Sequence, residues 1–396
     1  MKKLLIYIIS LIIFLKVNFN GVGFFGISLW FYLIAISFVL LIMFLKNKKI
    51  IIDKNYLKYL KLNIVFLILM FLVMIFNDNI QYNYMVILRY LFMIIFSILV
   101  YLVIQSKNDL RVLTNVIIFS VMFSSIFGIL QQFYPILYES ITTFLRINND
   151  NNLVTGRISG LSTTSITFSY ELVAASIICF SLFTKENRYF IFPILAILLF
   201  ALFVNQTRSA IIAVIFGFVL ISSGRHSFKK AGATLLILLV FVLGAYFLIN
   251  NLGIESRFFN DDVSSSSRIP MIYTALEYSL QFPFGTGVYD LSRANIDLSM
   301  YPATIVSTIL TNYTHNQFTN VLVEFGFLGL FTVLNIYTNI YKKHVSEAKF
   351  SKYNFLWIVV IIGYTINSLT HNGGIIHADP VIWLIFGIFY KHTLIK

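Results

Sequence analysis

The feature that most constrains this chain is a succession of apolar segments, each about as long as a bilayer is thick. A spanning helix needs about 20 mostly apolar residues, and twelve segments along the 396 residues come close to this. They lie near 4–20, 24–45, 60–77, 85–104, 112–133, 165–183, 189–205, 209–223, 232–250, 318–341, 353–370 and 378–391. The sequence therefore predicts an all-α integral membrane protein with about 12 transmembrane helices in one polytopic domain, 1–396.

Composition excludes the soluble classes. Only 11% of the residues are charged, against about 25% in soluble domains, and the mean hydropathy is +0.86. The net charge of +13 therefore predicts topology rather than nucleic-acid binding. Lys2 and Lys3 precede the first apolar run, as in a signal peptide, but no small-residue cleavage site follows and Lys16 interrupts the run, so we expect a retained helix. The single cysteine, Cys179, excludes a disulfide within the chain.

Basic residues predict the orientation. Alternate loops carry 21 lysines and arginines on one side and 6 on the other, with Lys16 and Arg89 inside spans. Positive charge concentrates in cytoplasmic loops, so both termini are predicted to be cytoplasmic. The six basic residues of the outer side are all arginines, whose donor fork matches phosphate or carboxylate.

Two predicted outer segments are long, at 134–164 and 251–317. The second is too long to be a plain connector. Within it, apolar residues at Ile269, Ile272, Leu276 and Leu280 have helical spacing. This spacing predicts an amphipathic helix over about 268–281 that lies on the membrane surface or caps a cavity.

Three arginines on the outer side are candidate ligand-binding residues. Arg208 lies in a very short turn between two spans, Arg157 lies beside glycines at the start of a span, and Arg268 opens the predicted surface helix. A charge near the membrane is expensive and is usually paired or functional. Simpler alternatives are an arginine that snorkels from a helix end for Arg208 and ordinary loop positions for the other two.

Histidines mark two outer helix ends. His315-Asn316 stands at the mouth of the span that holds Glu324, and the sequence Thr370-His371-Asn372 echoes Thr314-His315-Asn316. Histidine suits proton transfer near neutral pH, although an interfacial histidine is often a plain structural residue. Arg89, Glu171 and Glu324 lie inside spans, where Arg89 and a carboxylate could form an ion pair. The spacing of His377 and Asp379 gives no convincing metal site.

Together these features resemble the O-antigen ligase/O-antigen polymerase superfamily (Wzy/WaaL-like) of bacterial envelope glycosyltransferases. The resemblance rests on the topology, on His315-Asn316 followed nine residues later by Gly326-x-x-Gly329, and on three further motifs. These are Arg157 with Gly160, the Thr-Arg-Ser-Ala run at 207–210, and Arg268 leading to the Pro-x-Gly-x-Gly turn at 283–287. Recognisable motifs cover about residues 150–335, and Ile272 stands where the family pattern has leucine.

The resemblance implies a GT-C-like fold and transfer of a sugar from a polyprenyl-diphosphate-linked donor to a hydroxyl, without metal or other cofactor. His315 would be the general base, while Arg208 and Arg268 would stabilise the leaving diphosphate. Further substrate-binding candidates are Arg157, Asn316, Tyr289, Arg293, His371 and Glu324, with Tyr301 and Tyr313 as stacking residues and Arg146 and Arg257 as sites for a second anionic substrate. The implied location is the bacterial inner membrane, with the active site on the outer face.

Several functions stay open within and beyond this family. A polymerase that joins undecaprenyl-diphosphate-linked repeat units into O-antigen or capsule is favoured, because the extra arginines suit two diphosphate substrates. A ligase that transfers the polymer to lipid A-core or protein is the alternative. From other classes, a lipid-linked oligosaccharide flippase or a scaffold remains, although a transporter should place polar groups near the bilayer midplane. Expected partners are the lipid-linked oligosaccharides and membrane lipids, with a chain-length regulator and a flippase as candidates, and no nucleic acid.

Overall fold

The protein is described from a computed structural model, which covers residues 1–19, 23–24, 27–46, 52–76, 80–145, 157–183, 186–225, 266–311, 314–346, 352–371 and 379–392. Its helices are α1 Lys2–Phe19, α2 Leu29–Leu45, α3 Lys54–Phe76, α4 Ile80–Val103, α5 Lys107–Phe133, α6 Pro135–Phe144, α7 Ser165–Leu182, α8 Arg188–Asn205, α9 Arg208–Arg225, α12 Arg268–Gln281, α13 Ala303–Thr311, α14 Gln317–Ser346, α15 Lys352–Ser368 and α16 Pro380–His392. A 3-10 turn, η2, spans Leu291–Arg293, and two short strands, β1 Gly23–Phe24 and β2 Ile27–Ser28, pair antiparallel.

The helical membrane class is confirmed. Among the described residues, six helices are long and apolar enough to cross a membrane: α3, α4, α5, α7, α8 and α14. Four shorter apolar helices, α2, α9, α15 and α16, coincide with further predicted spans. The predicted span 232–250 lies outside the described residues, so the number twelve stays a prediction.

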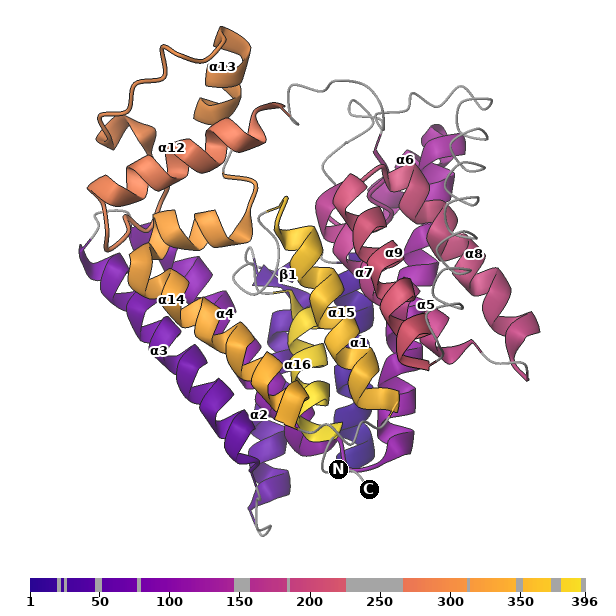
Figure 1. Cartoon of the computed structure of the whole chain (residues 1–396). Coiled ribbons are helices and arrows are strands. Elements are labelled where there is room, and N and C mark those ends of the chain that lie inside the picture. Colours follow the sequence, from indigo (N-terminus) through magenta and orange to yellow (C-terminus); the bar gives the residue numbers. More distant parts are fainter. Residues whose placement is uncertain are drawn as a thin grey trace.

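The helices form a bundle whose two termini lie at the same end (Figure 1). Helices α6, α12 and α13 stand at the opposite end, in the two segments predicted to be outer loops. The most extensive contacts join helices distant in sequence: α9 with α15, α3 with α14, and α4 with α16. The long segment predicted at 251–317 carries helices of its own, among them α12, which the apolar spacing over 268–281 predicted.

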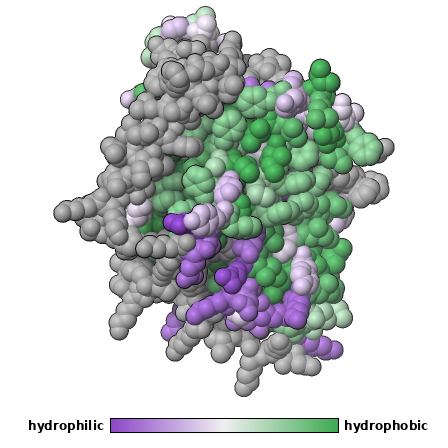
Figure 2. All heavy atoms as spheres, turned by 90° about the vertical axis from the view of Figure 1, so that its right-hand side faces the viewer, coloured by the Kyte–Doolittle hydropathy of each residue, from purple (hydrophilic) through white to green (hydrophobic). Residues whose placement is uncertain are grey.

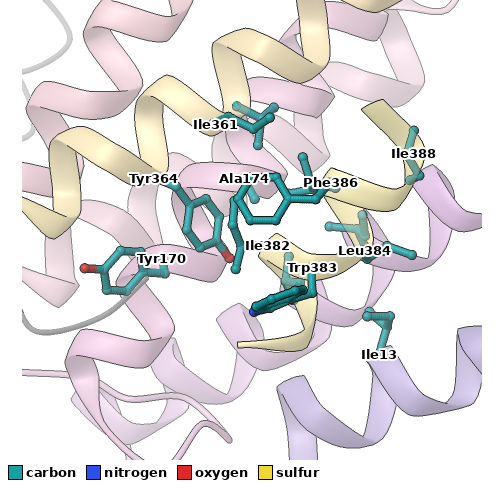
Figure 3. Packing of buried hydrophobic residues seen from close by; sticks show 14 of the residues in the cluster. Ile13, Tyr170, Ala174, Ile361, Tyr364, Ile382, Trp383, Leu384, Phe386 and Ile388 are labelled. Atoms are coloured by element: carbon teal, nitrogen blue, oxygen red, sulfur yellow. The ribbon is translucent and has the colours of Figure 1, made fainter. Parts of the chain in front are cut away.

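The core lies where α1, α7, α15 and α16 meet. Tyr170 and Ala174 of α7 face Tyr364 of α15, and Trp383 of α16 packs below them (Figure 3). The rings of Tyr170 and Tyr364 are 5.2 Å apart, within the range of favourable aromatic pairs. This packing joins the first and last helices of the chain to its centre.

Candidate active site

His315 lies on the short link that leads into α14. It is half-buried and has φ +48°, an uncommon conformation for a residue with a side chain. The next residue caps the helix, since Asn316 Oδ1 accepts from the amide of Phe318 at 2.8 Å. Asn316 Nδ2 also donates to the carbonyl of Leu369 at 2.9 Å. The backbone that carries His315 is therefore fixed to the end of α15, two residues before His371.

His315 and His371 share an electropositive environment. Burial, followed by the charges of Arg268 and Arg157, lowers the pKa of His315 below its usual 6.5. His371 is only 4% exposed. Burial, together with the charges of Arg268, Arg157 and His315, lowers its pKa to about 3. The structure thus brings four of the predicted residues into one region and keeps both imidazoles neutral at pH 7, so that each has a lone pair to accept a proton.

The loop that carries Arg157 is anchored on α5. The amides of Ser159 and Gly160 donate to Gln131 Oε1 at 2.8 and 3.2 Å. Gly160 has φ +59°, and an added Cβ would lie 2.6 Å from Ser124 Oγ. The close approach that this glycine permits is therefore toward α5.

Arg268 begins α12, which packs on α14. The buried face of α12 consists of Met271, Thr274, Ala275, Tyr278 and Ser279. The predicted apolar residues lie elsewhere on the helix: Ile269 and Leu280 are 66% and 73% exposed. The prediction of a helix over 268–281 is confirmed, and its apolar stripe is the outward face. Such a stripe fits a helix at a membrane surface.

A turn after α12 locks into a break in α14. Gly326 has φ +67° and ψ −170° inside α14, and the parts before and after it run in different directions (Figure 1). The amide of Gly287 donates to the carbonyl of Glu324 at 2.8 Å, and the amide of Phe327 donates to that of Pro283 at 3.0 Å. The Pro-x-Gly-x-Gly turn and the Gly326 motif are thus one structural unit, and the span predicted at 318–341 is not a single straight helix.

Arg208 is the first residue of α9, after a tight turn in which Gln206 has φ +57°. Two bonds tie this turn to the candidate site. Asn205 Nδ2 donates to the carbonyl of Ile158, next to Arg157, at 2.7 Å. Ser209 Oγ donates to Asn367 Oδ1 of α15 at 2.7 Å. These bonds place Arg208 at the same end of the bundle as His315, and its side chain is half-buried. Its charge does not contribute to the lowered pKa values of His315 and His371.

Three other candidates lie on the α12–α14 side. Glu324 is 5% exposed, and Asn320 lies one turn earlier on the same helix. Tyr289 packs edge-on against Tyr278 at 5.1 Å, in a small second cluster with Val323. Arg293 Nε lies 3.3 Å from Asp290 Oδ2, and its side chain is 37% exposed. None of the three contributes to the pKa shifts of the two histidines.

The buried ion network differs from the predicted one. Lys16 Nζ lies 2.6 Å from Glu171 Oε1 and 2.9 Å from Asp379 Oδ1. Ser162 Oγ donates to the other oxygen of Glu171 at 2.6 Å. The partner of Glu171 is thus Lys16, whereas Arg89 is exposed on α4. The sequence did not specify which carboxylate could pair with Arg89, and the structure excludes Glu171. Lys16, which interrupts the first apolar run, was the feature of the sequence that could have indicated a buried ion pair in this helix.

Other sequence candidates fall outside the described residues. They are Arg146, Arg257, Tyr313 and His377. Tyr301 lies just before α13 and lines a surface hollow together with Leu298 and Val306.

Residues 193–334 match the Wzy_C family model, described as O-antigen ligase. This region runs from α8 into α14 and includes Arg208, Arg268 and His315. It thus carries the O-antigen ligase domain of the Wzy/WaaL-like superfamily, as the motifs predicted. No curated protein matches the chain. This match supports, for the region it covers, the class of membrane glycosyltransferases of the O-antigen ligase/polymerase type.

Proposed function

We propose that the chain transfers a glycan from a polyprenyl-diphosphate carrier to a hydroxyl, and that the region around His315 is its active site. The observation that carries the proposal is the convergence of Arg157 and Arg268 on His315 and His371. Two guanidinium groups match the charge and the planar oxygen pairs of a diphosphate. A neutral histidine beside them supplies the base that a sugar hydroxyl needs.

The two histidines are suited to different tasks. His315 is half-buried and its pKa is lowered by burial and by the charges of Arg268 and Arg157, so it is neutral at pH 7 and accessible to an acceptor hydroxyl. His371 is almost fully buried, and its pKa of about 3 keeps it neutral throughout. We therefore assign the general base to His315 and substrate orientation to His371.

The reaction balances as a single inverting displacement. His315 accepts the proton of the acceptor hydroxyl while that oxygen forms a bond to the anomeric carbon. The bond from this carbon to the diphosphate oxygen breaks, and the electron pair leaves with the lipid diphosphate. Arg157 and Arg268 stabilise the charge that develops there, and Arg208 does so from the adjoining turn.

Within this class we propose a polymerase, located in the inner membrane with cytoplasmic termini. The termini lie opposite the candidate site (Figure 1), so cytoplasmic termini place the site on the outer face. Glu324, Tyr289 and Arg293 then lie on the α12–α14 side, where an acceptor carrying its own diphosphate would bind. The partners would be undecaprenyl-diphosphate-linked oligosaccharides, a chain-length regulator and a flippase.

Gene deletion followed by electrophoresis of the surface glycan tests the assignment. A polymerase mutant shows core carrying one repeat unit. A ligase mutant shows bare core with polymer retained on the carrier, and a flippase mutant fails to expose repeat units on the outer face. Complementation with His315→Ala should leave the deletion pattern unchanged, because losing a general base lowers the rate by about 10²–10⁴-fold. Normal polymer from this variant, present at wild-type level in the membrane, would contradict the proposal.

A further inference from the structure

A second site lies at the end of the bundle that is opposite to His315. It is a cavity of about 970 Å³ bounded by the N-terminal halves of α5 and α8, the end of α7 and the start of α15. The other ends of α5 and α8 are closed by Phe133 and Phe200, whose rings stack 6.3 Å apart. The two helices therefore pack at one end and leave a space between them at the other.

The walls of this cavity are apolar and its rim is basic. Ile118 of α5 and Ile194 of α8 line the interior, while Lys107 and Arg111 lie one turn apart at the rim. Figure 2 shows the side of the molecule where α5 and α8 lie, with a hydrophobic surface above and hydrophilic residues gathered in its lower part. An apolar slot with cations at its mouth has the polarity of a lipid with an anionic head group.

Among the described residues, the carboxylates near the basic rim do not compensate its charge. Asp109, on the same turn of α5, points to Lys2 at 2.7 Å and accepts from the amides of Gln105 and Ser106. Glu186 precedes α8, is exposed and does not line the cavity. The charge that the described residues bring to the mouth is therefore that of Lys107 and Arg111.

One polar group in the wall, the indole N–H of Trp357, lacks a hydrogen-bond acceptor among the described residues. Trp357 lines the cavity and is 2% exposed, and its Nε1 has no hydrogen-bond partner among the described residues. A buried donor without an acceptor is unfavourable, so a ligand with an oxygen at this depth would satisfy it.

We propose that this cavity binds an anionic glycerophospholipid from the leaflet on the side of the termini. One acyl chain lies between α5 and α8, an ester carbonyl accepts from Trp357 Nε1, and the phosphate meets Lys107 and Arg111. The site is separate from the proposed catalytic centre and does not depend on the reaction assigned there.

Fluorescence quenching of Trp357 tests the site directly. The chain has three tryptophans, so replacing Trp30 and Trp383 by Phe leaves Trp357 as the sole fluorophore. The full chain is placed in nanodiscs that contain a few mole percent of brominated phosphatidylglycerol or brominated phosphatidylcholine. Brominated phosphatidylglycerol should quench at a lower mole fraction, by roughly fivefold for each basic residue that it contacts.

Variants separate the site from general lipid contact. Lys107→Gln with Arg111→Gln should abolish the preference for phosphatidylglycerol and leave quenching by phosphatidylcholine unchanged, which also reports an intact fold. Arg188→Gln is the matched control, because Arg188 is engaged by Tyr189 at 2.7 Å and does not line the cavity. It should keep the preference.

Three outcomes would overturn the proposal. They are equal quenching by the two lipids, a preference that survives the double substitution, and displacement of brominated phosphatidylglycerol by undecaprenyl phosphate at a lower mole fraction than by phosphatidylglycerol itself. Native mass spectrometry of the unmodified chain provides a second measurement. It should show retained phosphatidylglycerol on the wild type and less on Trp357→Phe.

Discussion

Gly285 and Gly326 meet so closely that neither position has room for a side chain. Both have positive φ, at +81° and +67°, and a Cβ on Gly285 would lie 2.6 Å from the amide nitrogen of Gly326. This contact joins the turn after α12 to the break in α14. Arg268 begins α12 and His315 directly precedes α14, so the contact ties together the two helices beside which these residues lie.

Substituting Gly326 by Ala should therefore disturb both stability and transfer. We expect a loss of about 1–3 kcal/mol, because alanine is strained at this φ and its Cβ meets backbone. Thermal unfolding in detergent and glycan transfer are the measurements. Gly128→Ala is the control, since there the added Cβ meets the tip of Ile158 at 2.9 Å and the nearest backbone atom lies at 3.5 Å. Equal effects of the two substitutions would contradict the proposed lock.

The charge of Arg268 should set the acid limb of the pH–rate profile. Burial and the neighbouring arginines lower the pKa of His315 below 6.5, so the rate should rise with pH below that value and level off above it. Removing a positive neighbour makes the imidazolium less unfavourable, so Arg268→Gln should move the limb to higher pH. Arg268→Lys keeps the charge and should keep the limb in place. The measurement is the residual transfer rate of both variants from pH 4 to 8. If the acid limb of Arg268→Gln stays at the wild-type pH, His315 is not the general base.

Burial of neutral His371 should make the protein acid-sensitive. Its pKa is about 3 in the folded chain against about 6.5 when unfolded. Between these values the unfolded state binds the extra proton, so stability is complete above pH 6.5 and falls as the pH falls. From pH 6.5 to 5 the contribution is roughly 2 kcal/mol. Unfolding of wild type and His371→Asn over this range should show a flatter slope for the variant, and parallel slopes would refute the assignment.

Removing Lys16 should destabilise the bundle more than removing an exposed lysine. Lys16→Met leaves the buried Glu171 and the partly buried Asp379 without their cation, for which about 3–5 kcal/mol is expected. Combining it with Glu171→Gln and Asp379→Asn should recover much of the loss, because no uncompensated charge then remains. Lys58→Met, on an exposed position of α3, should change stability little. Thermal unfolding of the four proteins gives the comparison.

Hydropathy sufficed to predict most helices, because a chain in lipid must satisfy its backbone groups within each segment. Eleven of the twelve predicted spans coincide with described helices, and the twelfth lies outside the described residues. The convergence of Arg157, Arg268, His315 and His371 was partly expected, since all four were placed on one face. Their grouping depends on helix packing, which periodicity does not determine.

The sequence was a poorer guide to contacts between elements. The apolar stripe of α12 includes Ile269 and Leu280, and hydropathy alone does not distinguish a stripe that faces lipid from one that faces protein. The partner of Glu171 was missed for a similar reason. Lys16 lies 155 residues away, and only the folded bundle shows that it, and not Arg89, reaches the carboxylate.

The Lys16 network also has a consequence for the order in which the chain assembles. Its members come from the first helix, from α7 and from the residue just before the last helix. A growing chain therefore carries Lys16 through the synthesis of more than 350 residues before both carboxylates exist. The network closes only once Asp379 has been made, so the final packing of α1 waits for the segment that leads into α16.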